Sequence, residues 1–201
     1  MNTATTSSPN HDHLYQIAEA QAGYFTAAQA KLAGFSHALT AYHMQSGLFE
    51  RIRPGLYRLK RFPASPHEDL FVAWLRAGTR AVISHDSALA LYDLSDLLPY
   101  EIHLTVPRTA SRRHSGLRLH TNRLEPADVT HYAGLPVTTV PRTLADMAAS
   151  GLSEELVRQA IQEALRRGLT TTEQLRMNAS RRGGRVCKLV EQSLAAGSNP
   201  L

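Results

Sequence analysis

GYFTAAQAKLAGFSHALTAYHMQSGLFERIRPGLYRLK, residues 23–60, is the stretch of this chain that decides its fold. Thr26 can cap the Ala-rich segment that follows it, with the apolar Phe25 placed just before the cap, and Gly34 can end that helix in the left-handed conformation. Ser36 can cap a second helix, which another glycine ends. Two short helices joined by a glycine-containing turn are typical of a helix-turn-helix, whose second helix enters the major groove of DNA.

The residues after the second helix predict a β-hairpin. LFERIR and LYRLK are two short strands on either side of a Pro54-Gly55 turn, which completes a winged helix-turn-helix. Residues 1–63 carry six Lys and Arg against three acids, and five of those six cations lie between Arg51 and Arg61. Basic residues also protect an edge strand from aggregation. Directly after a helix-turn-helix, however, a basic hairpin favours contact with nucleic acid.

Composition narrows the class of protein. With 201 residues, a net charge of +5 and a sequence pI near 9.7, the chain is long enough for two small domains and suits an anionic partner. The single cysteine excludes an internal disulfide framework. The polar N-terminus lacks the apolar core of a signal peptide, and nowhere do eighteen apolar residues run together. These features predict a soluble protein of the cytoplasm.

We expect three parts along the chain. Residues 1–11 are predicted to be a disordered tail. Residues 12–63 form the winged helix-turn-helix, with an additional helix starting after Asp12. The Pro-rich segment 61–66 marks the linker, and residues 64–201 form a second domain.

The second domain is predicted to be α+β. A helix capped by Ser65-Pro66 opens it, and its last sixty residues read as a run of helices that starts at Pro141, with Thr170 or Thr171 capping one of them. Between these helical parts, period-two alternation and short apolar runs predict strands. The predicted strands are 81–84, 101–106, 117–121 and 134–140, with a helix over 85–94. The whole chain is therefore α+β, a winged helix-turn-helix followed by a small sheet with helices.

Base contacts would come from the second helix of the motif, at Ser36, His37, Thr40, His43 and Gln45. Its helical phase is ambiguous, because either Tyr42 or His43 can be the last core residue or a phosphate contact. The helix carries no Arg or Lys, which are the commonest readers of guanine. We therefore expect modest base readout.

Most of the affinity for DNA would come from cations that contact phosphate. The predicted phosphate contacts are Arg51, Arg53, Arg58, Lys60 and Arg61, with Arg53 at the wing tip also suited to the minor groove. A second basic patch is predicted in the loop 107–116, at Arg108, Arg112 and Arg113. This patch is either a solvated hairpin tip or a second contact with a nucleic acid or an acidic protein.

No motif predicts catalysis. Ten histidines are present, but HExxH and CxxC are not, and His103 and His120 on neighbouring predicted strands are explained by the polar side of a sheet as well as by a metal. The acids, Asp128 and Asp146 among them, are scattered without a nuclease pattern. No nucleotide-binding glycine motif occurs. We expect no enzyme, no cofactor and no metal.

Several segments together resemble the AbiEi antitoxins of type IV abortive-infection toxin–antitoxin systems, over roughly residues 15–190. These segments are GYFTAAQAKLAGFS, YHMQSGLFERIRPGLYRL, ISHDSALALYDL, HLTVPR, GLPVTTVPRTLADMA and EALRRGLTT. The resemblance implies a winged helix-turn-helix that binds the protein's own promoter, with residues 36–45 as recognition helix and 51–60 as wing. It also implies a C-terminal antitoxin domain and a nucleotidyltransferase-like toxin as functional partner, without need of a stable complex. The family's helix often has Arg where this chain has His37.

Two other functions stay open at this stage. One is a one-component transcriptional regulator whose C-terminal domain senses a ligand or oligomerises, with no toxin. The other is an enzyme that modifies a toxin or a nucleic acid, which the missing motifs disfavour. Because single winged helices bind weakly, we expect double-stranded DNA with inverted repeats, bound cooperatively by a monomer or weak dimer.

Overall fold

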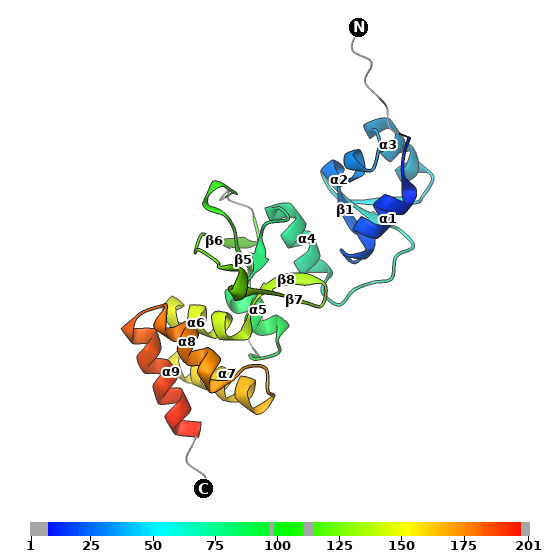
Figure 1. Ribbon diagram of the computed structural model, residues 1–201. Helices are drawn as coiled ribbons and strands as arrows, with labels where there is room; N and C mark the ends of the chain where they lie inside the picture. Colours follow the sequence, from blue (N-terminus) through cyan, green and yellow to red (C-terminus); the bar gives the residue numbers. More distant parts are fainter. Residues whose placement is uncertain (1–7, 97–98, 111–114, 198–201) are drawn as a thin grey trace. The chain divides into compact units, whose positions relative to one another are not determined.

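The structure, a computed structural model, describes residues 8–96, 99–110 and 115–197. Helices and strands occur in both halves of the chain, which confirms the α+β class (Figure 1). The chain divides into two compact units. The first extends to Thr79 and includes Ala133–Leu135, and the second comprises Arg80–Tyr132 and the chain from Pro136 onward. The first unit thus continues beyond residue 63, where the winged helix-turn-helix was expected to end.

Helices and a small antiparallel sheet make up the first unit (Figure 1). The helices are α1 (His11–Glu19), α2 (Ala27–Leu32), α3 (His37–Gln45) and α4 (Glu68–Ala77). The sheet has the order β1-β3-β2, from β1 (Tyr24–Thr26), β2 (Phe49–Arg53) and β3 (Leu56–Leu59). The two wing strands were predicted. Strand β1 was not, because three residues are too few to show a period.

The predicted caps of α2 and α3 are confirmed. Thr26 Oγ1 accepts a hydrogen bond from Gln29 N at 3.2 Å, and Gln29 Oε1 accepts one from Thr26 N at 2.8 Å, which is a complete capping box. Ser36 Oγ accepts from the backbone N–H three residues on, at 3.1 Å. Gly34 and Gly47 follow the two helices with φ of 84° and 76°, a region where only glycine is free of strain.

Two helix starts differ from the prediction. Helix α1 begins at His11, because the Asn10 side chain caps it, and residues 1–7 of the predicted tail lie outside the described residues. Helix α4 begins at Glu68 rather than at Ser65-Pro66, because Ser65 Oγ accepts from His67 N and closes a turn ahead of the helix.

Aromatic rings form the core of the first unit. Phe25 is fully buried, and its ring centroid lies 4.9 Å from that of Phe49 and 5.7 Å from that of Tyr57. Leu14 of α1 belongs to the same cluster. Burial of each such side chain contributes about 1.5–3 kcal/mol. Because the cluster joins α1, β1, β2 and β3, it fixes the wing against the helices.

The second unit is built on a mixed sheet with the order β6-β5-β4-β8-β7. The strands are β4 (Val82–Ile83), β5 (Ile102–Thr105), β6 (Leu117–His120), β7 (Val129–Tyr132) and β8 (Leu135–Thr138). Strand β5 runs parallel to β6 and antiparallel to β4, which is parallel to β8. Strand β7 was not predicted, because its side chains are mostly exposed and it lacks an apolar run.

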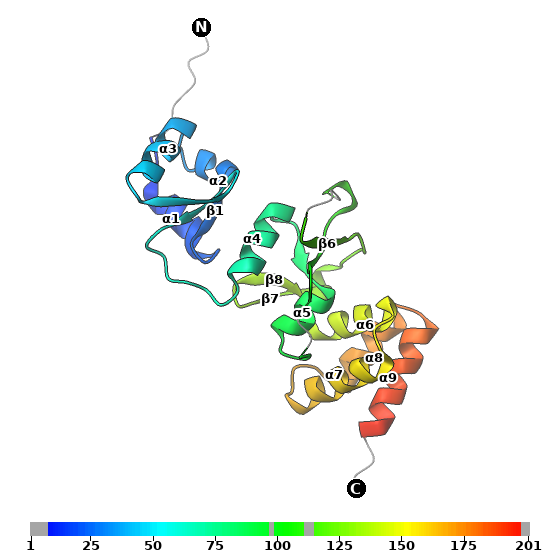
Figure 2. The ribbon, with the colours of Figure 1, turned by 180° about the vertical axis from the view of Figure 1, so that it is seen from behind.

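Helices cover one side of this sheet. They are α5 (His85–Leu91), α6 (Val140–Ser150), α7 (Glu154–Arg166), α8 (Thr172–Ser180) and α9 (Gly184–Gly197). Figures 1 and 2 show α6 to α9 grouped together, with α5 between α6 and the sheet. Thr171, one of two predicted caps, begins α8 with a capping box to Gln174. Within the described residues, no helix is long and apolar enough to cross a membrane.

Candidate nucleic-acid interface

Helix α3 presents one face to solvent and packs its other face on β2. Ser36, His37 and Gln45 are exposed, as expected for base contacts. Tyr42 is also exposed, by 61%. The ambiguous helical phase is therefore resolved with Tyr42 outward.

The predicted base contacts of Thr40 and His43 are wrong, because both side chains are buried. Thr40 Oγ1 donates back to Ser36 O at 3.0 Å, within its own helix. The His43 ring lies 5.0 Å from that of Phe49 and 5.7 Å from that of Phe35. Both residues hold α3 on the core instead of facing a groove.

Burial also disfavours a positive charge on His43. Desolvation, with a smaller contribution from His11, lowers the pKa of the His43 imidazole below its usual value. Neither ring nitrogen of His43 has a hydrogen-bond partner among the described residues. A charged imidazole here would have no compensating group, so acid should weaken the packing of α3.

The wing carries cations that are available to a partner. Arg51, Arg53, Lys60 and Arg61 are exposed, and none of them forms an ion pair in the part of the chain that the structure describes. Gly55, two residues after Arg53, has φ of 76° at the hairpin tip. The geometry therefore leaves four of the five predicted phosphate contacts free to reach DNA.

The prediction that the fifth cation, Arg58, contacts phosphate is wrong. Its guanidinium donates to Phe62 O at 3.1 Å and to Pro63 O at 3.0 Å. It also lies 3.2 Å from the Glu68 carboxylate and 5.5 Å from the centre of the Tyr24 ring. With its side chain only 14% exposed, Arg58 ties β3 to the linker and to the start of α4.

We expect Arg58→Gln to lower the stability of the first unit by about 1–2 kcal/mol. The substitution removes the hydrogen bonds that the charged guanidinium donates to two carbonyl oxygens, and it removes the partly exposed ion pair with Glu68. Trp74, the single tryptophan, lies on α4 and reports on this unit by fluorescence during urea unfolding. The exposed Arg51→Gln is the matched control and should not move the midpoint. Equal midpoints for both variants would contradict the role given to Arg58.

The predicted second basic patch is described only in part. Arg108 is exposed in a short 3₁₀ turn, Arg108–Ala110, after β5. Arg112 and Arg113 lie outside the described residues.

The two histidines predicted on neighbouring strands do lie together, and a third joins them. Strands β5 and β6 pair in parallel with Thr105 opposite His120, and the rings of His103 and His120 are 5.2 Å apart. His85 stacks on His120 with centroids at 3.5 Å. Burial is the main cause that lowers the pKa of His85 to about 3 and that of His120 to about 4. Among the described residues no group of three or more His, Cys, Asp or Glu is placed to hold a metal.

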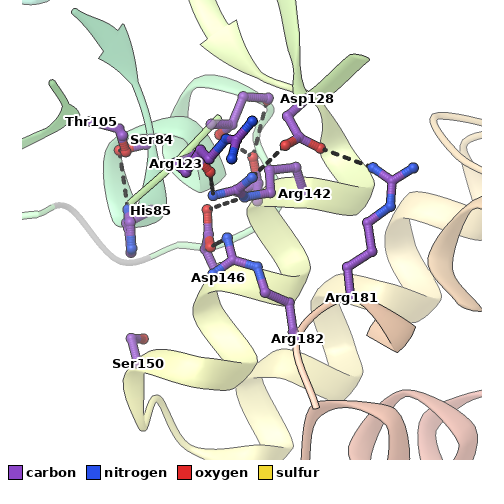
Figure 3. Close-up of polar contacts among 12 residues, drawn as sticks. Ser84, His85, Thr105, Arg123, Asp128, Arg142, Asp146, Ser150, Arg181 and Arg182 are labelled. Atoms are coloured by element: carbon purple, nitrogen blue, oxygen red, sulfur yellow. Dashed lines mark hydrogen bonds and ion pairs between the residues drawn. The ribbon is translucent and has the colours of Figure 1, made fainter. Parts of the chain in front are cut away.

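An ion-pair network that sequence reasoning missed lies where α6 meets the loops (Figure 3). Arg142, 5% exposed, places Nη1 2.5 Å from Asp128 and Nε 2.9 Å from Asp146. Its Nη2 donates to Arg123 O at 3.1 Å. Arg182 contacts the second oxygen of Asp146.

The pair Arg142 and Asp146 has the i,i+4 spacing of a helical ion pair, and it sits in a helix that is otherwise buried along most of its length. In the sequence, this spacing was the feature that could have indicated the network. Nothing in the sequence links Asp128 or Arg182 to it, because they come from segments far away along the chain. The network joins these segments to α6.

Comparison with known proteins supports the first unit most directly. Residues 13–60, from α1 to the end of the wing, match a family model described as a transcriptional regulator, AbiEi antitoxin. The match confirms the resemblance over this segment. No curated protein matches the sequence.

A solved structure resembles the whole fold. It is the crystal structure of the RV2827C protein from Mycobacterium tuberculosis, with a TM-score of 0.57 and 13% sequence identity. The similarity covers 98% of this chain and 81% of that chain. At this identity the likeness shows the fold alone.

Proposed function

We propose, from the match of residues 13–60 to antitoxin transcriptional regulators, that this protein is a cytoplasmic DNA-binding antitoxin that represses its own operon. The observation that carries the proposal is the exposed face of α3 together with four exposed cations of the wing that form no ion pair within the described residues, Arg51, Arg53, Lys60 and Arg61. A helix and a cationic hairpin on one unit suit a major groove and its flanking phosphates.

Ser36, His37, Tyr42 and Gln45 are the side chains that contact base edges in this proposal. Arg51, Lys60 and Arg61 contact phosphates, and Arg53 reaches a minor groove from the wing tip. Because α3 carries no Arg or Lys, phosphate contacts supply most of the affinity, and binding falls steeply with salt. A monomer or weak dimer binds inverted repeats cooperatively, since one unit contacts only a half-site.

The second unit carries the antitoxin function in this proposal. Its target is a nucleotidyltransferase-like toxin, and no stable complex between the two proteins is required. The support is the family match of the first unit together with the motifs that extend the resemblance into the second.

The DNA half is tested by anisotropy titration of the duplex upstream of the protein's own gene, at two salt concentrations. We expect R51Q/R53Q/K60Q to bind about 10–100-fold more weakly, with a salt slope smaller by about 0.9 for each phosphate that the variant no longer neutralises. The matched control, R166Q/R176Q/R185Q, removes the same charge from exposed positions of the second unit and should bind as the wild type does. Equal losses of affinity in both triple variants would show non-specific attraction and contradict the proposed interface.

The antitoxin half is tested by co-expressing the full chain with a nucleotidyltransferase-like toxin encoded next to it. Growth should be restored by the wild type and also by R51Q/R53Q/K60Q, because the wing does not act on the toxin. Growth arrest in the presence of wild-type protein that still binds the upstream duplex would favour the other candidate, a regulator without a toxin.

A further inference from the structure

An open cavity of about 650 Å³ lies at one edge of the sheet in the second unit. Its walls are the segments that follow β5 and β6, together with the first residues of β4 and β7. The cavity is distinct from the winged helix-turn-helix, since all its lining residues lie between 80 and 129. Its volume is within the range of small-molecule sites.

The topology of the sheet favours a ligand at this place. Strands β5 and β6 are parallel, so both of their carboxyl ends point to the cavity. In open α/β sheets, ligands bind beyond the carboxyl ends of the parallel strands, and the pair β5 and β6 offers two such ends side by side. Here the residues that converge are Pro107 and Arg108 after β5, and Thr121 and Asn122 after β6.

Three arginines give the cavity a positive charge. Arg80, Arg108 and Arg123 line it, and none of the described lining residues is an acid. Arg80 and Arg108 are exposed and form no ion pair within the described residues. Arg123 lies 2.9 Å from Glu125, but both side chains are exposed, and such a pair exchanges easily for a better partner. Guanidinium groups bind phosphate through paired N–H donors.

The remaining wall is apolar with a few polar atoms. Val82, Val106, Leu124 and Val129 supply apolar surface, next to the hydroxyl of Thr121 and the amide of Asn122. Inorganic phosphate would leave the apolar part of the wall unused. A nucleotide uses the whole lining, because its base offers a flat face and hydrogen-bonding edges and its phosphates carry the charge.

The loop that carries Arg123 is held in place by hydrogen bonds and ion pairs. Arg123 O accepts a hydrogen bond from buried Arg142, which is paired with Asp128 (Figure 3). Asp128 in turn accepts from Glu125 N at 3.0 Å. The backbone of residues 123–128 is thus fixed before any ligand binds, which lowers the entropy cost of binding.

We propose that this cavity binds a nucleotide, with Arg80, Arg108 and Arg123 contacting its phosphates and the apolar wall contacting its base. The site gives the second unit a ligand of its own, independent of DNA binding by the wing. The ligand is either a free nucleotide or a nucleotide within a single strand, since both present the same chemistry.

Calorimetric titration of the full chain with ATP tests the proposal, with adenosine and a single-stranded tetranucleotide as parallel ligands. We expect saturable binding of ATP, at least tenfold weaker binding of adenosine, and at least a tenfold loss of ATP affinity in R80Q/R108Q. Both positions are exposed, so circular dichroism should show an unchanged fold. Whichever of ATP and the tetranucleotide binds more tightly identifies the source of the nucleotide.

The control variant is R51Q/R53Q, which removes the same charge from the wing. It should keep the wild-type affinity for ATP while its binding to the upstream duplex weakens, so the two proposals fail separately. Absence of ATP and tetranucleotide binding, or equal losses of ATP affinity in R80Q/R108Q and R51Q/R53Q, would overturn the nucleotide site.

Discussion

Arg142→Met is expected to destabilise the second unit by about 3–5 kcal/mol, because it leaves two buried carboxylates without their main partner. The side chain of Asp146 is 0% exposed and that of Asp128 is 6% exposed. Burial already raises the pKa of Asp146 against the opposing effect of Arg142 and Arg182. Without Arg142, the ion-pair partner left to Asp146 within the described residues is Arg182, and that left to Asp128 is the more distant and half-exposed Arg181, at 3.8 Å.

Urea unfolding followed by far-ultraviolet circular dichroism measures this destabilisation, while fluorescence of Trp74 follows the first unit separately. The triple variant D128N/R142M/D146N removes both carboxylates together with Arg142 and should recover part of the stability, since the remaining cost is that of Arg182, which loses Asp146. The exposed pair of α7 is the control, and E163Q/R166Q should leave the unfolding curve unchanged. An unchanged curve for Arg142→Met would show that the network contributes nothing to the fold.

Lowering the pH from 7 to 5 is expected to cost the second unit about 4 kcal/mol, roughly 2 from each of two histidines. The folded pKa is about 3 for His85 and about 4 for His120, whereas an unfolded histidine titrates near 6.5. Below about pH 6.5, His85 and His120 therefore bind protons in the unfolded chain that they do not bind in the folded chain. The stability that comes from keeping these two histidines uncharged is fully present above about pH 6.5, and it is lost progressively as the pH falls towards about 4.

The groups that face this pair explain the direction of the shifts. Burial is the largest cause for both rings. His120 and His103 also lower the pKa of His85, and His103 lowers that of His120. Arg182 acts in the same direction on His85, and Arg118 on His120. Asp86 opposes them, but its carboxylate lies 2.9 Å from His103 instead.

The same unfolding experiment at pH 7 and pH 5 checks this prediction. H85N/H120N should flatten the dependence on pH, whereas H37N, at an exposed position of α3, should leave it as in the wild type. A wild-type second unit equally stable at both pH values would contradict the uncharged state of the stacked pair.

Local signals in the sequence were enough for the winged helix-turn-helix. Thr26, Ser36 and the glycines that follow each helix act on their own turn of chain, so their residue types predict the caps that the structure has. The exposed wing residues also follow from local sequence, because a short hairpin has few ways to bury a cation.

The predictions that were wrong or missing concern residues whose surroundings come from distant parts of the chain. Arg58 looks like its wing neighbours in sequence, and only the position of Glu68 and of two carbonyl oxygens takes it away from solvent. His43 was misplaced because α3 has apolar residues on more than one side, so that periodicity did not determine which of Tyr42 and His43 faced the core. The network around Arg142 joins residues 123, 128, 146 and 182, and no short window of sequence contains it.

The first unit takes its last residues, Ala133–Leu135, from well beyond its main segment, which ends at Thr79. During synthesis, N-terminal units generally fold first as they leave the ribosome. Here the helix-turn-helix can form its caps and aromatic core early, but the unit is complete only after residues 80–135 have been added. At about 5–20 residues per second this takes several seconds. A nascent chain therefore presents the helix-turn-helix and its wing before Ala133–Leu135 can join the first unit.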